Sequence, residues 1–146
     1  MAFRFSETLI IFRLQSFGYL FIIKVLFSEV TGMADSPLIV KSKAFALDAI
    51  RVCKELRAAK CEGALINQFL RSSTCVGANI REAIYAHGKA DFIAKLQIAL
   101  KECSESEYWL ELLLESGYYS DKAILDKCIE VKRILIASIN TAKDNR

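Results

Sequence analysis

The cysteines and the single histidine are the side chains that could most readily bind a metal ion or take part in covalent chemistry. Zinc sites combine cysteines and histidines at short spacings, and a di-metal carboxylate site in a helical bundle needs two Glu-x-x-His motifs. His87 is the one histidine and no two cysteines form a CxxC pair, so neither pattern can be completed. We therefore expect no metal ion and no cofactor. The five cysteines are Cys53, Cys61, Cys75, Cys103 and Cys128.

Three of these cysteines fall where a helix would direct them inward. A buried free cysteine behaves as a small hydrophobic residue, and reduced thiols are typical of the cytoplasm. We predict reduced, structural cysteines in a cytoplasmic protein.

Nucleophilic catalysis is not indicated either. A serine or cysteine nucleophile needs a base with an orienting partner, and the chain has no glycine-flanked serine or cysteine elbow and no glycine-rich phosphate loop. His87 stands beside Gly88 and is predicted to be an exposed loop residue. We predict that the protein is not an enzyme and has no small-molecule substrate.

The most unusual segment is a run of small and polar residues from Arg71 to Glu82. Small residues let a neighbouring helix approach closely, and the spacing would let Glu82 reach Asn79 or the start of the next helix. These residues could form a ligand site. We favour a hydrogen-bonded network that fixes helix register or a protomer interface, because buried polar groups need partners. Its members are Arg71, Ser73, Gly77, Asn79 and Glu82.

Basic residues are concentrated between positions 41 and 60, where six cations accompany two acids, whereas positions 89 to 116 hold three cations and six acids. The net charge of +3 does not by itself indicate a nucleic-acid-binding protein. The clustered cations could nevertheless follow RNA phosphates with a steep salt dependence. They could also form an ordinary solvated face, or pair with the acidic helix of a neighbouring protomer. The candidate nucleic-acid-binding residues are Lys43, Arg51, Lys54, Arg57 and Lys60.

Three tyrosines lie near the predicted helix ends: Tyr85, Tyr118 and Tyr119. They could stack on bases. We favour caps on the core or anchors of an interface.

The elements that position these residues are helices, because apolar residues after Pro37 recur every three or four positions and no segment alternates as a strand would. We predict helices over about residues 41–59, 64–86, 90–116 and from Ser120 onward, with Ser120 as N-cap and Gly117 as a left-handed cap. The short links between them make sequential helices antiparallel neighbours. The predicted fold class is all-α, an antiparallel up-down-up-down four-helix bundle spanning residues 38–146.

The same periodicity predicts which side chains face the bundle axis. They are Phe45, Ala49, Val52 and Leu56 in the first helix; Ile66, Phe69, Ser73, Val76, Ile80 and Ile84 in the second; Phe92, Leu96, Ala99, Cys103, Ser106, Leu110 and Leu113 in the third; and Ile124, Cys128, Val131, Leu135 and Ser138 in the fourth.

Residues 1–37 do not share this pattern and are assigned to a separate N-terminal leader. The stretch from Leu9 to Phe27 is apolar but contains Arg13 and Lys24, and cations within a membrane-spanning window are costly. No clear signal-peptidase site follows. We expect no membrane association; Met33 as the true start, preceded by an upstream translation artefact, is one hypothesis, and a membrane-tethered form is another.

Three motifs together resemble a known family. They are the run with Ser73, Gly77, Asn79 and Glu82, the Ala90-Asp91-Phe92 start of the third helix, and the Glu-x-x-Tyr-Trp-Leu segment from Glu105 to Leu110. They resemble the four-helix bundle proteins also called 23S rRNA intervening-sequence proteins, and the resemblance covers almost all of residues 42–141. The accessory variability determinant of diversity-generating retroelements looks like a relative with a more basic surface.

The resemblance implies a left-handed antiparallel bundle, a homo-oligomeric ring that is commonly a pentamer, and a role with RNA. We therefore expect a non-catalytic, ring-forming bundle that binds RNA or a ribonucleoprotein through its basic faces. The alternative is a protein-interaction scaffold that forms an oligomer without binding nucleic acid.

Overall fold

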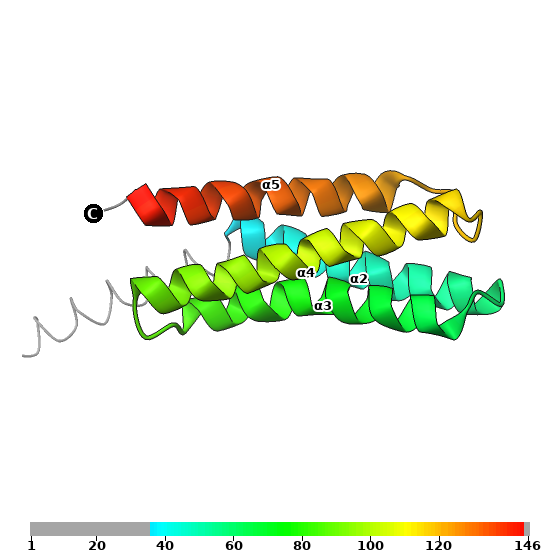
Figure 1. Cartoon of the computed structure of the whole chain (residues 1–146), viewed down its shortest axis with the longest axis horizontal. Coiled ribbons are helices and arrows are strands. Elements are labelled where there is room, and N and C mark those ends of the chain that lie inside the picture. Colours follow the sequence, from blue (N-terminus) through cyan, green and yellow to red (C-terminus); the bar gives the residue numbers. More distant parts are fainter. Residues whose placement is uncertain (1–35, 145–146) are drawn as a thin grey trace, which may run out of the picture. The chain divides into compact units, whose positions relative to one another are not determined.

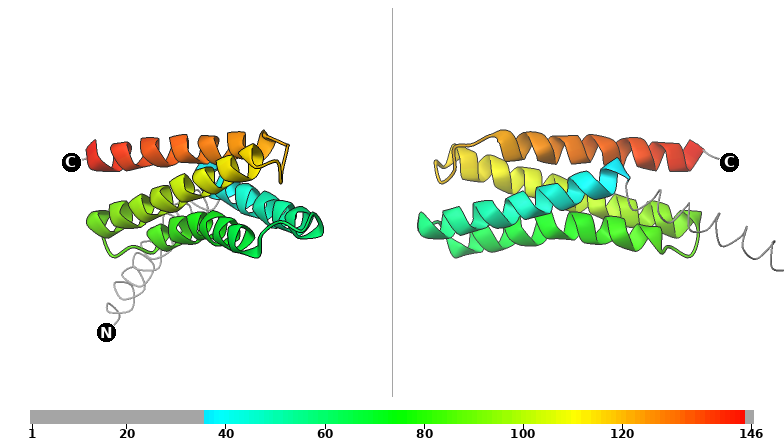
Figure 2. Two further views of the ribbon diagram at one scale, coloured as in Figure 1. Left: turned by 45° about the vertical axis from the view of Figure 1, so that its right-hand side comes forward. Right: turned by 180° about the vertical axis from the view of Figure 1, so that it is seen from behind.

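The computed structural model describes residues 36–144, and these form four long helices (Figure 1). The helices are α2 (Pro37–Ala58), α3 (Gly63–Ile84), α4 (Lys89–Glu115) and α5 (Ala123–Asp144). Consecutive helices run in opposite directions along a common axis, as the views in Figure 2 also show. Each helix packs against the next in the chain, and α2 also packs against α5. The predicted all-α, antiparallel four-helix bundle is confirmed.

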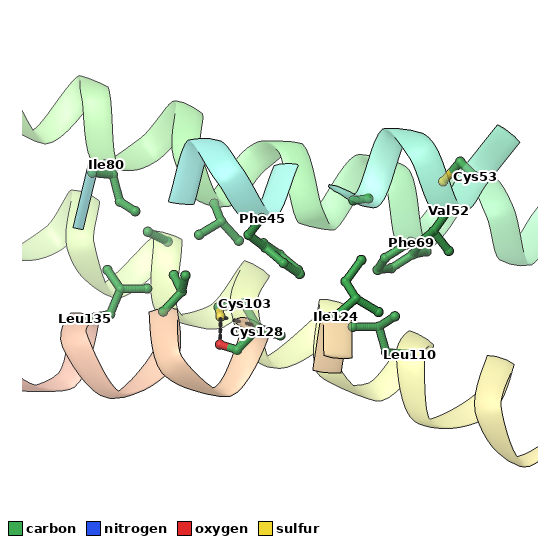
Figure 3. Close-up of a cluster of buried hydrophobic side chains, with 14 of the residues drawn as sticks. Phe45, Val52, Cys53, Phe69, Ile80, Cys103, Leu110, Ile124, Cys128 and Leu135 are labelled. Atoms are coloured by element: carbon green, nitrogen blue, oxygen red, sulfur yellow. Dashed lines mark hydrogen bonds between the residues drawn. The ribbon is translucent and has the colours of Figure 1, made fainter. Parts of the chain in front are cut away.

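The core is a single cluster of buried side chains along the bundle axis (Figure 3). Phe45 of α2 and Phe69 of α3 are fully buried within it, and burial of each such side chain stabilises the fold by roughly 1.5 to 3 kcal/mol. Nearly all of the predicted inward residues are buried. The periodic spacing of apolar residues therefore identified the core of this bundle.

The predicted inward positions are wrong at three helix ends. Ala83 is buried where Ile84 was expected, and Ile139 where Ser138 was expected, while Phe92 is only half-buried. A straight α-helix drifts about 20° per heptad relative to a strict 3.5-residue repeat. The inward stripe of α5 has therefore moved one residue later, to Ile139. In α3 the buried positions instead keep alternating steps of three and four residues as far as Ala83, so the expected step of four from Ile80 to Ile84 was one residue too long.

Helices α2 and α4 both end in a left-handed residue. Gly117 follows α4 with φ 77°, which confirms the predicted cap, and its N–H donates to the Leu114 carbonyl. Lys60 follows α2 with φ 55°, a conformation that is costly for a residue with a Cβ atom. The N–H groups of Lys60 and Cys61 donate to the carbonyls of Arg57 and Leu56, which is the Schellman pattern.

The start of α5 differs from the prediction. The helix begins at Ala123, and the Asp121 carboxylate accepts a hydrogen bond from the Ala123 N–H at 2.8 Å. Ser120 was predicted as the N-cap, and this is wrong. Asp121 is the better acceptor because its charged carboxylate also interacts favourably with the positive end of the helix dipole.

None of the helices within residues 36–144 has the length and apolar composition required to cross a bilayer. The predictions for the leader fall on residues 1–35, which lie outside the described part of the chain.

Lys60→Gly should stabilise the protein by about 0.5 to 1 kcal/mol, because glycine adopts the left-handed conformation without the Cβ clash. Urea denaturation followed by circular dichroism measures the change. Lys60→Ala, which removes the same charge and keeps the Cβ, is the matched control and should lie within about 0.5 kcal/mol of the parent. Equal stability of the two variants would show that Lys60 is not strained.

Candidate nucleic-acid interface

The outward face of α2 carries a seam of five residues, here called the α2 seam, that is directed away from the core. Its members recur at spacings of four and three, so they lie on one face of the helix. Two of them are apolar and exposed, Leu47 at 49% and Ile50 at 38%, whereas the other three are exposed cations. The α2 seam consists of Lys43, Leu47, Ile50, Lys54 and Arg57.

The cations of the α2 seam have no ion pair within residues 36–144. The same is true of Lys60, just beyond the end of α2. Lys41, in contrast, pairs with Glu130 of α5 at 2.7 Å. The face of α2 that turns away from its neighbours is thus the one whose positive charge is not neutralised.

Arg51 is separated from this group, although it was predicted to belong to it. Its guanidinium pairs with Asp48, and Asp48 also pairs with Lys127 of α5. These residues line a pocket of about 250 Å³ together with Glu55, Tyr119 and Asp121. The acids around this pocket counter the charge of Arg51, so of the predicted cations Arg51 is the one least available to an anion.

Three acidic residues of α4, Glu102, Glu105 and Glu107, pair with cations inside the protomer. Glu105 accepts from Arg71 of α3 at 2.5 Å and from the Trp109 indole N–H at 3.3 Å, and its hydrogen bond and charge raise the pKa of Arg71. Glu107 pairs with Lys132 of α5. These contacts explain the Glu-x-x-Tyr-Trp-Leu segment, because Glu105 joins α3 to the half-buried tryptophan.

The polar residues on α3 bond to separate partners within the protomer. Glu82 pairs with Lys95 of α4 at 2.6 Å and raises its pKa through that hydrogen bond. Asn79 donates to the Cys75 carbonyl one turn earlier in its own helix. Of the two partners predicted for Glu82, the next helix and Asn79, the structure shows the contact with the next helix.

The small residues of α3 do allow close approach, on two sides. A Cβ atom placed on Gly77 would lie 3.8 Å from Ser42 Oγ of α2, which is ordinary van der Waals contact. On the other side, the buried Ser106 hydroxyl of α4 donates to Ser72 Oγ of α3 at 2.9 Å. The Ser72–Ser106 contact is the buried polar link between these helices, and the sequence analysis did not identify it.

Ser73, which was predicted to belong to the network, is fully buried, and its hydroxyl has no hydrogen-bond partner within residues 36–144. A buried polar group without a partner costs about 1 to 3 kcal/mol. Ser73 therefore does not contribute to the polar links between α3 and α4.

The three tyrosines have different environments. Tyr85, between α3 and α4, is 83% exposed. Tyr119 packs against the core at the other end of the bundle, where burial and then the charges of Glu55, Asp121 and Asp48 raise its pKa. Tyr118 lies beside it on the surface, so Tyr85 and Tyr118 are the two that could stack on a base.

His87 is an exposed loop residue, as predicted.

Residues 35–137 match the family described as 23S rRNA-intervening sequence protein. The fold is also similar to a crystal structure of a protein of unknown function from the S23 ribosomal protein family of Bacteroides thetaiotaomicron VPI-5482. The two chains are 43% identical, the TM-score is 0.68, and the match covers 70% of this chain and 97% of the other. No curated protein matches the sequence. The predicted family is confirmed; the relation to the accessory variability determinant stays a prediction.

Ser72→Ala and Ser73→Ala should have opposite effects on stability, although they remove the same atom from adjacent buried positions. Ser72→Ala should destabilise by about 1 kcal/mol through loss of the bond to Ser106, whereas Ser73→Ala should be neutral or stabilise by up to about 1 kcal/mol. Thermal unfolding of both variants beside the parent measures the difference. Equal losses would mean that the Ser73 hydroxyl has a partner.

Proposed function

The chain belongs to the family of 23S rRNA-intervening sequence proteins, and we propose that it binds RNA or a ribonucleoprotein through the exposed cations of α2, without catalysing a reaction. Lys43, Lys54 and Arg57 of the α2 seam and Lys60 beyond it would contact phosphates. The observation that carries the proposal is that these cations have no ion pair within residues 36–144 and lie along one exposed side of α2 and just beyond its end.

Lys54 and Arg57 are three residues apart, about 5 Å along the helix axis at 1.5 Å per residue, which is comparable to the spacing of phosphates along a nucleic-acid strand. Lys43 lies eleven residues before Lys54, about 16 Å along the axis, so it would contact a more distant phosphate. Each phosphate contact releases counterions and so contributes affinity without sequence specificity. Tyr118, near the Lys60 end of α2, offers an exposed ring on which an unpaired base could stack.

One protomer offers only a few contacts, so the proposal includes a homo-oligomer, with a pentameric ring as the form that the family resemblance implies. Repetition of the α2 cations around a ring would let one RNA engage several weak sites, and effective concentration would then raise the total affinity. The free cysteines of residues 36–144 support a reducing, cytoplasmic setting for such an assembly.

A second candidate function follows from the apolar members of the same seam. Leu47 and Ile50 lie between cations at the spacing with which helices pair in coiled coils, and Val40 is exposed nearby. If the α2 seam is itself the contact between protomers, the protein is a scaffold and its cations face acids of a neighbour. Glu111 and Glu115 of α4 are exposed and without an ion pair in the described region, so they are available for this.

The RNA proposal is tested by fluorescence anisotropy with a labelled RNA hairpin at about 50 mM and about 200 mM salt. Lys54→Glu combined with Arg57→Glu should weaken binding at least about tenfold and reduce the slope of log K against log salt by about 2. Arg81→Glu combined with Lys101→Glu is the matched control: it makes the same change in net charge at exposed positions of α3 and α4, and it should retain most of the affinity. Absence of binding at low salt, or equal loss in both variants, would exclude the α2 site.

The scaffold alternative is tested by the mass of the particle in solution. If the α2 seam joins protomers, Leu47→Glu combined with Ile50→Glu should convert the oligomer to a folded monomer in light scattering. Ile98→Glu combined with Ile136→Glu, exposed apolar residues of α4 and α5, should leave the mass unchanged. An oligomer that survives the α2 substitutions and binds RNA would favour the first proposal.

A further inference from the structure

Cys103 of α4 and Cys128 of α5 form a buried pair of thiols near the middle of the bundle. Their sulfur atoms are 3.7 Å apart and both side chains are fully buried (Figure 3). Both residues were predicted to be inert core positions. That interpretation accounts for their burial and leaves their proximity unexplained.

The contacts around the two sulfurs show that the helices approach closely here. Cys103 Sγ lies 3.4 Å from the Cys128 carbonyl oxygen, and Cys128 Sγ lies 3.5 Å from the Cys103 carbonyl oxygen. Each thiol therefore reaches the backbone of the opposite helix. A disulfide needs a sulfur–sulfur distance of about 2.0 Å and neighbouring Cβ atoms, so rotation of the two side chains with a small helix shift would bring the sulfurs into bonding range.

The other cysteines lack this arrangement. Within residues 36–144, the sulfur atoms of Cys53 and Cys61 are hydrogen-bonded to the carbonyls of Ile66 and Glu62, respectively, both at 3.9 Å, and burial raises the pKa of Cys53 to about 11. Cys75 is half-buried, and no sulfur–sulfur contact is formed by it within residues 36–144. Cys103 and Cys128 are thus the pair of thiols within the described region that is placed for a bond to each other.

We infer that Cys103 and Cys128 are a site of oxidative modification, at which hydrogen peroxide closes an intramolecular disulfide that locks α4 to α5. One of the two thiols, as the thiolate, attacks one peroxide oxygen, the O–O bond breaks, and the released hydroxide takes up a proton to give water. The other thiol then attacks the sulfur of the sulfenic acid and loses its proton, and a second water leaves. Two thiols and one peroxide give one disulfide and two waters.

Either cysteine can be the attacking group in this step. The two sulfurs are 3.7 Å apart and either one can donate to the other. The thiolate is the reactive form, so the thiol that ionises when α5 opens attacks the peroxide, and its neighbour resolves the sulfenic acid.

The disulfide would hold α5 against α4. It joins the middle of α4 to the second turn of α5 and closes a loop that contains residues 104–127. Because both thiols are buried, a peroxide molecule reaches them only when α5 opens locally. Oxidation would therefore trap the closed bundle and prevent further opening.

The test uses the full chain, treated in its folded state with a small excess of hydrogen peroxide, then denatured, alkylated and digested with trypsin. Cleavage at Lys101, Lys122, Lys127 and Lys132 places Cys103 in peptide 102–122 and Cys128 in peptide 128–132, each without another cysteine. We expect these two peptides to appear joined, two hydrogen atoms lighter than their sum, and to separate on reduction. Amide exchange in α5 should slow at least severalfold in the oxidised protein.

Cys128→Ala should abolish the joined peptide, and the matched control Cys75→Ala should leave its yield unchanged; circular dichroism confirms that both variants are folded. The inference is overturned if the parent protein shows oxidation of Cys75 and no joined peptide. Linkage of other cysteine pairs in equal amounts, or unchanged exchange in α5 after linkage, would overturn it as well. RNA binding enters none of these measurements.

Discussion

The four helices must bury their apolar faces in one shared core, and the rest of this structure depends on that constraint. Most of the stability of a helix in a protein comes from packing of its amphipathic face, so each of the four helices places its inward stripe against the others. Phe45 and Phe69 are fully buried in this core. The close approach at Gly77 and Ser42, the Ser72–Ser106 contact and the facing thiols of Cys103 and Cys128 all occur where small side chains meet.

The distribution of charge follows from the same packing. Packing of α3, α4 and α5 brings opposite charges on neighbouring helices together. The resulting ion pairs are Arg71 with Glu105, Lys95 with Glu82, and Lys132 with Glu107. Such exposed pairs contribute little stability individually. None of these pairs involves the outward cations of α2: within residues 36–144, Lys43, Lys54 and Arg57 have no ion pair and lie on one face of the helix, and this is what supports an anionic ligand there.

The α2 seam mixes two kinds of surface. Its cations favour a phosphate backbone, and its exposed Leu47 and Ile50 favour a helix of another protomer. A surface of this kind can serve one purpose at a time, because apolar residues buried in an oligomer contact would place the neighbouring cations against protein. The two proposed functions therefore differ in whether RNA or another protomer binds the α2 seam.

The sequence by itself determined the helices, their antiparallel order and most of the core, because burial of one helical face imposes a period that can be counted along the chain. It also identified the basic segment and the family. Only the tertiary structure decided which side chains meet across helices: that Arg51 is engaged by Asp48, that Ser72 and not Ser73 bonds to α4, and that two cysteines 25 positions apart face each other. The physical reason is that the spacing of apolar residues along a helix specifies which of its faces turns inward. The partner of a given side chain depends instead on the axial offset between helices, which is set by the packing of the whole core.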